Sequence, residues 1–223
     1  MTFSLVGRCA RSGQVGVAVA SSSPAVAARC AHVRAGVGAA ASQNVTDPEL
    51  GPLALDLMAA GRTAEAALAE LLEGRAHAAH RQLLAVDRKG GVALRTGARA
   101  LGLWAEARGD GCAAAGNLLA DPGVPAAMIA AFEASEGALA ERLMAALEAG
   151  LEAGGEAGPV RSAGLTVADR LSWPIVDLRI DWADAPVAML RAAWEVYRPQ
   201  IADYVRRALD PEAAPPYGVP GET

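Results

Sequence analysis

Thr2 is the residue of this sequence with the clearest capacity for chemistry. Cells remove an initiator methionine when the second residue is small, which would leave Thr2 with a free α-amine beside its hydroxyl. An α-amine has a pKa of roughly 7.7–8, so much of it is neutral near neutral pH and can accept the hydroxyl proton. Thr2 is therefore a candidate N-terminal nucleophile. The alternative is a β-branched residue that only opens a strand.

Polar residues at the ends of predicted strands are the next candidates. Asn117 follows Gly116 and could hold an oxyanion with its side-chain N–H, or it could simply form a turn. Gln43 and Asn44 follow a glycine-rich apolar segment, and Thr96 ends another strand in the same way. Such side chains could bind a substrate amide, although they more often satisfy backbone groups of a loop.

No metal or cofactor is expected from the remaining reactive side chains. His77 and His80 stand three residues apart, but no third ligand has matching spacing, so we interpret them as surface residues near a helix end. The cysteines have mostly apolar neighbours and are interpreted as buried thiols rather than nucleophiles; they are Cys9, Cys30 and Cys112.

Alternation and helical spacing predict the elements that would position these residues. The strands expected are residues 2–9, 15–21, 33–42, 81–87, 91–96, 111–118, 162–169 and 175–181. The helices expected are two between residues 49 and 74, then 122–135, 138–153 and 186–209. Gly61 and Thr63 resemble a C-cap followed by an N-cap, which divides the first helical stretch.

This order of elements predicts an α+β fold in which stacked sheets are covered by helices. Strict alternation of strand and helix is absent, which argues against a dinucleotide-binding sheet. We expect one domain over residues 1–210, with a flexible tail over residues 211–223 that is rich in proline and glycine.

Composition excludes several classes of protein. The chain has 223 residues, of which 52% are hydrophobic and 20% charged, and its net charge is -5 without a basic cluster. We therefore expect no nucleic-acid partner. No apolar run is long enough to span a membrane, and the N-terminus lacks the features of a signal peptide. An odd number of widely spaced cysteines favours reduced thiols in a cytoplasmic protein.

The last predicted helix carries an apolar stripe that includes Leu190, Trp194, Tyr197 and Ile201. Packing into the core is the default interpretation of such a stripe. If a residue such as Trp194 were exposed, the stripe would instead mark the surface of a homodimer.

Several segments together resemble a bacterial family, the domain-of-unknown-function 1028 family. They are residues 2–6, 16–21, 36–43, 116–119, 141–150 and 176–181. The resemblance implies a fold like that of the N-terminal-nucleophile (Ntn) hydrolases, a four-layer αββα sandwich of two facing, mainly antiparallel sheets. It also implies amide hydrolysis by Thr2 with Asn117, and it places Arg161 and Ser162 among the substrate-binding residues.

The sequence also departs from the pattern of that family. The stretch after Gly155 usually carries Asp and several Arg, whereas here only Arg161 is kept, and Trp182-Ala183 stands where Asp-His is usual. Lys89 follows a different hairpin and does not supply the lysine that proteasome-type relatives place near the nucleophile.

Two functions therefore remain open. The first is an amidohydrolase in which Thr2 attacks a small amide or peptide-like molecule. The second is a protein of the same scaffold that binds a ligand or assembles without catalysis.

Overall fold

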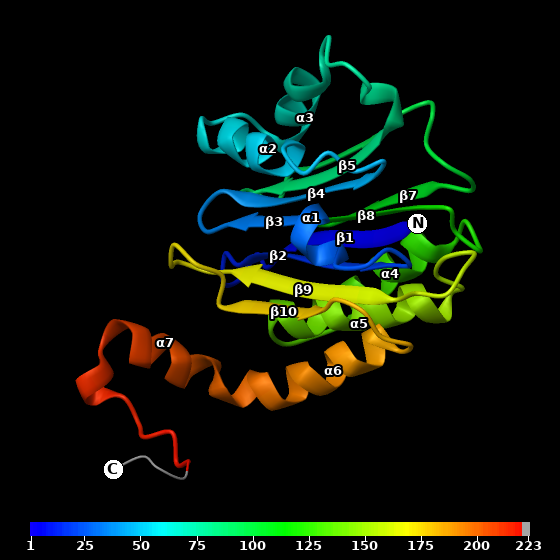
Figure 1. The fold of residues 1–223 in the computed structure, drawn as a ribbon. Coiled ribbons are helices and arrows are strands. Elements are labelled where there is room, and N and C mark those ends of the chain that lie inside the picture. Colours follow the sequence, from blue (N-terminus) through cyan, green and yellow to red (C-terminus); the bar gives the residue numbers. More distant parts are fainter. Residues whose placement is uncertain (220–223) are drawn as a thin grey trace.

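The computed structural model describes residues 1–219 and has two antiparallel sheets with helices packed on them (Figure 1). The 6-stranded sheet has the spatial order β10 (Val176–Ile180), β9 (Ser162–Ala168), β2 (Val15–Ser21), β1 (Thr2–Arg8), β8 (Cys112–Asn117) and β7 (Ala105–Gly109). The 4-stranded sheet has the order β3 (Ala31–Arg34), β4 (Gly38–Asn44), β5 (Arg81–Asp87) and β6 (Val92–Thr96). The α+β prediction is confirmed.

Most of the helices lie on the outer faces of the two sheets, whereas the short helix over residues 26–30 contacts strands of both sheets. The α-helices are α1 (Val26–Cys30), α2 (Leu50–Ala59), α3 (Ala64–Leu72), α4 (Val124–Ala134), α5 (Leu139–Glu152), α6 (Pro186–Tyr197) and α7 (Ile201–Leu209). Short 3-10 helices are η1 (Ala78–His80), η2 (Arg198–Gln200) and η3 (Pro211–Ala213). Helices α2 and α3 cover the smaller sheet, and α4, α5 and α6 cover the larger one (Figure 1).

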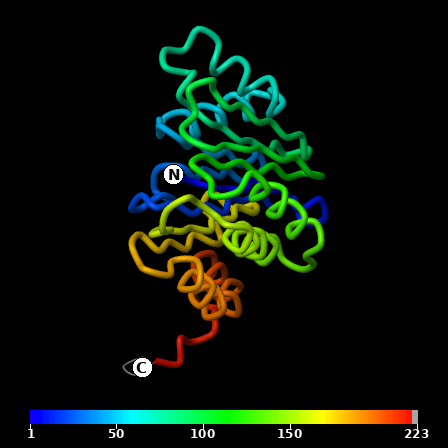
Figure 2. The backbone as a smooth tube through the Cα atoms, turned by 90° about the vertical axis from the view of Figure 1, so that its right-hand side faces the viewer, coloured from blue at the N-terminus to red at the C-terminus, as the bar shows by residue number. Residues whose placement is uncertain are grey.

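The inner faces of the sheets pack against each other, with β1 and β2 contacting β4. Figure 2 shows the N-terminus at mid-height and at one side of the molecule, whereas the segment that leads to residue 219 runs out at one end. The first strand, β1, is a central strand of the larger sheet and faces the smaller sheet.

The alternation of side chains along β1 determines which of its residues face the smaller sheet. Phe3 and Leu5 point to the helices and join the core formed with α4 and α5. Val6 joins the core between the sheets. Because side chains alternate along a strand, Thr2 and Ser4 share the face of Val6. The hydroxyl of Thr2 therefore points into the layer between the sheets.

The predicted caps between the first two long helices are confirmed. Gly61 has a φ of +96°, a backbone conformation that favours glycine. The hydroxyl of Thr63 accepts a hydrogen bond from the Ala66 backbone N–H at 3.2 Å, which caps the start of α3.

Two of the predicted elements are wrong in their extent. Residues 33–42 do not form one strand but belong to the β3–β4 hairpin, which turns at Gly36 with a φ of +69°. The predicted helix over residues 186–209 is interrupted at Arg198–Gln200, because Pro199 lacks the N–H that a continuous helix needs.

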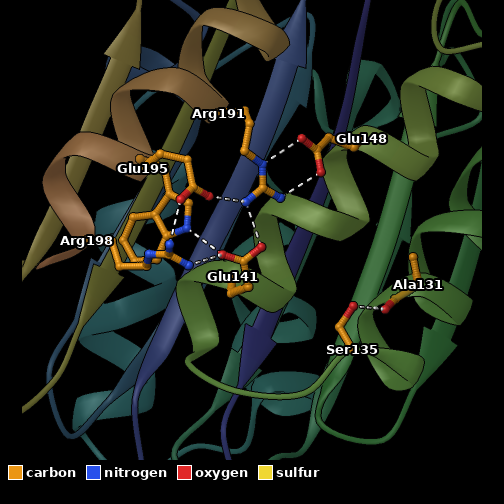
Figure 3. A network of polar contacts seen from close by, with 8 residues as sticks. Ala131, Ser135, Glu141, Glu148, Arg191, Glu195 and Arg198 are labelled. Carbon is orange, nitrogen blue, oxygen red and sulfur yellow. Dashed lines mark hydrogen bonds and ion pairs between the residues drawn. The ribbon is translucent and has the colours of Figure 1, made fainter.

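Helix α6 is fixed to α5 by a buried side chain and an ion-pair network. Trp194 is buried, and its indole Nε1 donates to Glu141 at 2.6 Å. Arg191 donates to both Glu141 and Glu148, and Figure 3 shows its guanidinium between the two carboxylates. Trp194 thus belongs to the core rather than to an exposed stripe, so the homodimer remains a prediction without support from this residue.

The tail expected over residues 211–223 falls partly outside the described residues, which end at 219. Within the described part, Pro211–Ala213 form η3, and the guanidinium of Arg207 lies 3.9 Å from the centre of the Tyr217 ring. Across residues 1–219, none of the helices combines the length and the apolar character required to cross a bilayer.

Candidate functional site

Thr2 lies at the end of the sandwich where β1, β2 and β8 come together. It is 5% exposed, pairs with Asn117 in the β1–β8 ladder, and its Oγ1 lies 3.3 Å from Ser21 Oγ at the end of β2. The hydroxyls of Thr2 and Ser21 both donate to the carbonyl oxygen of Met1. Two hydroxyls therefore converge on the carbonyl that precedes the predicted nucleophile.

A chain of polar side chains, all of them buried except Thr96, lies nearby between the sheets. Ser4 Oγ donates to Gln43 Oε1 at 2.6 Å, and Gln43 Nε2 donates to Gln82 Oε1 at 2.8 Å. Asn117 Nδ2 donates to the same Gln82 oxygen at 3.1 Å. Gln82 Nε2 in turn donates to Thr96 Oγ1 at 3.0 Å. The chain joins both sheets at the end where Thr2 lies.

These contacts fix the orientation of the Asn117 amide. The Nε2 of Gln82 faces two acceptors, Thr96 Oγ1 and the Gly116 carbonyl, so its Oε1 must face Asn117. A flipped Asn117 would place two acceptors together. Asn117 Oδ1 is consequently left buried and has no hydrogen-bond partner among the described residues. Such a group is an acceptor available to a donor placed at this site.

We expect the Gln82→Met substitution to lower the free energy of unfolding by about 2–4 kcal/mol, because it leaves buried donors of Gln43 and Asn117 without their shared acceptor. Denaturant unfolding measures this effect. Leu83→Met on the same strand is the control and should cost less than about 1.5 kcal/mol. Equal stabilities of Gln82→Met and the unmodified chain would contradict the network.

Glu156 is a site residue that sequence reasoning missed. It lies in the loop after α5, which is tied to the segment after β8 by the hydrogen bond from Ala157 N to Leu118 O at 2.9 Å. Glu156 is 5% exposed, and both carboxylate oxygens accept from the Ser22 backbone N–H at 3.0 Å. Burial raises its pKa to about 7, while Ser22 and the Met1 amine act to lower it. A buried titratable carboxyl thus stands beside the start of the chain.

The raised pKa of Glu156 makes stability depend on pH. Between about pH 4.5 and 7 the folded chain keeps a proton that the unfolded chain loses, so stability falls as pH rises through this window. The Glu156→Gln substitution removes this titration. We expect the variant to gain about 3 kcal/mol relative to the unmodified chain between about pH 5 and pH 8, as measured by denaturant unfolding.

The matched control for that prediction is Glu152→Gln, which makes the same charge change at an exposed position at the end of α5. This control should keep the pH dependence of the unmodified chain. Parallel pH profiles of Glu156→Gln and the unmodified chain would show that Glu156 titrates normally.

The other predicted site residues lie around this centre with different partners. Asn44 fixes a loop, because its Nδ2 donates to His80 O at 2.6 Å and its Oδ1 accepts from Leu101 N at 3.2 Å. Ser162 Oγ donates to Ser23 O at 2.6 Å. One hydrogen-bond network therefore joins Gln43, Thr96 and Asn117. In contrast, the side chains of Asn44 and Ser162 form hydrogen bonds with backbone groups of loops.

Arg161 reaches the site through its backbone. Its N–H donates to Ser21 O at 2.8 Å, while its guanidinium pairs with Asp184 and lies 5.9 Å from the centre of the Trp182 ring. Trp182 is 63% exposed. The side chain of Arg161 is thus turned toward the surface beside Ser21.

The histidines, the lysine and the cysteines lie apart from this arrangement. The rings of His77 and His80 are 6.5 Å apart, and in residues 1–219 no three His, Cys, Asp or Glu side chains gather as metal ligands. Lys89 lies in the β5–β6 turn, at the opposite end of β5 from Gln82. The three cysteines are buried and free, as predicted, and burial raises the pKa of Cys112 to about 12.

An open groove of about 910 Å³ lies elsewhere, between α7 and the segment that joins β9 to β10. Leu171, Ile175, Val205 and Leu209 contribute apolar surface to it. It contains neither a nucleophile nor an unpartnered buried polar group, so the arrangement around Thr2 is the stronger candidate for chemistry.

Comparison with known proteins agrees with the resemblance found in the sequence. A model described as a family of unknown function (DUF1028) matches residues 2–190. The chain is also similar to the crystal structure of protein SPO2555 from Silicibacter pomeroyi, which is assigned to the same family model. The two are 30% identical with a TM-score of 0.84, and the match covers 92% of this chain and 90% of that chain. No curated protein matches the chain.

Proposed function

The chain belongs to the DUF1028 family, and from this premise we propose that it is an amidohydrolase with Thr2 as its N-terminal nucleophile. One observation carries the proposal. The hydroxyl of Thr2 is buried between two sheets, beside Ser21 Oγ and in the ladder position opposite Asn117, whose Oδ1 lacks a partner among the described residues. A merely structural threonine would not need an unsatisfied acceptor next to it.

The proposed reaction begins with a chain whose first residue is Thr2. The Thr2 Oγ attacks the substrate carbonyl carbon, and its proton passes to the Thr2 α-amine. The resulting ammonium protonates the leaving nitrogen when the C–N bond breaks, which leaves an ester on Thr2. Water then attacks the ester, gives one proton to the amine, and releases a carboxylic acid as Thr2 Oγ regains its proton. The sum is one amide plus water giving one acid and one amine.

Asn117 and Ser21 have complementary roles in this proposal. One hydrogen of Asn117 Nδ2 is used by Gln82, which leaves the other for an oxyanion and leaves Oδ1 to orient the Thr2 amine. Ser21 Oγ already donates to a carbonyl oxygen next to Thr2. It is therefore a second candidate oxyanion donor.

The order of layers supports the same proposal. Two facing antiparallel sheets between helices, with the first strand inside the sandwich, agree with the Ntn-hydrolase-like αββα fold that the family resemblance implies. Fold alone does not establish an activity, so the proposal depends on the site.

Labelling with an electrophile tests this function. A chain that begins at Thr2 should be acylated by a β-lactone at that residue, as shown by intact mass and peptide mapping. The same chain with Met1 attached should not react, because its Thr2 nitrogen is an amide and cannot accept the proton. Equal labelling of both forms, or labelling elsewhere, would contradict the proposed nucleophile.

Ligand binding without catalysis is the second candidate function, and one observation favours it. With Met1 in place, the Met1 carbonyl engages the hydroxyls of both Thr2 and Ser21. A chain that keeps Met1 would lack the free amine and could only bind. Turnover of an amide by the purified chain would exclude this alternative.

A further inference from the structure

The strand ladder of the larger sheet places an exposed tryptophan in line with the proposed nucleophile. Thr2 pairs with Asn117 in the β1–β8 ladder. On the next strand outward, Ala105 pairs with Gly116, so the residues that follow at this end of the sheet are Trp104 and Asn117. Adjacent strands are about 4.8 Å apart, which puts the backbone of Trp104 about 10 Å from that of Thr2.

Alternation of side chains indicates which way Trp104 points. Ala105 and Ala107 pack against the core that contains α4 and α5, whereas Glu106 between them accepts a hydrogen bond from Thr96 Oγ1 of the smaller sheet at 2.5 Å. Side chains two residues apart share a face, so Trp104 takes the side of Glu106, toward the smaller sheet. Trp104 is 45% exposed, which places it at the open end of the layer between the sheets.

Trp104 ends the segment that joins β6 to β7, which crosses from the smaller sheet to the larger one on the side where the N-terminus lies (Figure 1). Backbone hydrogen bonds fix this segment, since Leu118 N donates to Leu101 O at 3.0 Å and Leu119 N donates to Leu103 O at 2.9 Å. Leu101 and Leu103 are nevertheless as exposed as Trp104. These three side chains, from the uncharged sequence Leu-Gly-Leu-Trp, form an ordered surface that we call the apolar rim.

From this arrangement we infer that the substrate amide carries an aromatic or similarly bulky apolar group, and that the apolar rim binds this group through Trp104. This inference rests on the proposed function. Two strand spacings equal about three residues of extended chain, so a small peptide-like amide held at Thr2 and Asn117 can reach the rim.

The physical character of the rim selects this class of ligand. Several large apolar side chains exposed side by side commonly mark a binding surface, and the backbone bonds of the segment reduce the entropy lost on binding. The indole of Trp104 offers a flat face on which a ring can stack. A charged substituent would be partly desolvated against the rim and would find no opposite charge on it, so the rim disfavours such substrates.

Binding to a chain that begins at residue 2 and carries Thr2→Ala tests the inference without turnover. The probes are N-benzyl-2-phenylacetamide, which has a ring on each side of the amide, and N-methylacetamide, which has the amide alone. NMR titration gives the Kd of each. We expect the first probe to bind at least about tenfold more tightly, because it buries a ring. Trp104→Ala should weaken its binding at least about fivefold, and Trp104→Phe should restore the Kd to within about threefold.

Trp173→Ala is the matched control. Trp173 is also an exposed tryptophan, but it lies in the turn between β9 and β10, at the opposite end of the sheet from Thr2. This substitution should leave the Kd unchanged. Weaker binding after Trp173→Ala, with no effect of Trp104→Ala, would place the probe at the far end of the sheet and overturn the inference.

The remaining outcomes separate this inference from the proposed function. A Kd that Trp104→Ala leaves unchanged, or failure of the aromatic probe to bind, would overturn the apolar specificity even if a β-lactone acylates Thr2. Loss of binding in Trp104→Ala, together with no acylation of Thr2, would retain the apolar binding site and contradict the hydrolase. If Trp104→Ala instead converts a dimer to a monomer in sedimentation and leaves the Kd unchanged, the rim is an interface between copies and the inference is wrong.

Discussion

Replacing Thr2 by alanine in a chain that begins at this residue should lower kcat/KM for amide hydrolysis by at least about 10³-fold, because the attacking oxygen is lost. The remaining groups, Ser21 and Asn117, can polarise a carbonyl, but neither supplies an oxygen beside the α-amine that serves as the base. Substrate binding should change far less than the rate, since Ser21 and the amide network are kept. Steady-state kinetics with an anilide substrate separate these two effects.

Thr2→Ser and Thr2→Val are the matched variants for this prediction. Serine keeps the hydroxyl and should retain most of the activity, whereas valine keeps the shape of threonine and should behave like alanine. Activity of the valine variant close to that of threonine would place the nucleophile elsewhere in the chain.

Replacing Trp194 by alanine should lower the free energy of unfolding by about 3–5 kcal/mol, because it removes a large, fully packed side chain. The indole contacts the core under α6 and donates to Glu141, which also receives Arg191. Its loss leaves a cavity and takes one donor from a partly buried carboxylate. The free energy is measured by denaturant unfolding, with far-UV circular dichroism as the signal.

Met189→Ala on the same helix is the control, since the Met189 side chain is half exposed. It should cost less than about 1 kcal/mol. A similar small cost for Trp194→Ala would mean that α6 contributes little to the fold. The ion pairs of Arg191 would not change that conclusion, because partly exposed ion pairs contribute little to the free energy of unfolding.

Much of the fold could be predicted because its signals are local. The alternation in residues 2–9 and 15–21 gave β1 and β2, and the Gly61–Thr63 pair gave the boundary between α2 and α3. Strand β7 alternates alanine with the exposed Glu106 and Arg108, but it has only 5 residues and its alanines give a weak apolar signal. Helix α1 has 5 residues, too few to show helical spacing.

The break between α6 and α7 was visible in Pro199 but was outweighed by the continuous apolar stripe on both sides of it. The single segment expected over residues 33–42 failed for a similar reason. The residues on both sides of the turn within this range are mostly apolar or small, and Gly36 was the main indication of a turn.

The residues of the candidate site likewise fall into those that the sequence could indicate and those that only the structure reveals. Thr2 and Asn117 could be proposed from chemistry, position and family resemblance. Gln82 and Glu156 could not, because their roles arise from contacts with residues far away in the sequence, such as Asn117 and Ser22. The acid usually found after Gly155 in the family was the available hint for Glu156. Contacts between residues far apart in the sequence produce no periodic pattern of residue types.

The most direct test of this account is the intact mass of the protein purified from its native host, before and after treatment with a β-lactone. We predict a chain without Met1 that gains one acyl group on Thr2. A native chain that keeps Met1 and gains no mass would contradict the account, because the Thr2 nitrogen could then not accept a proton.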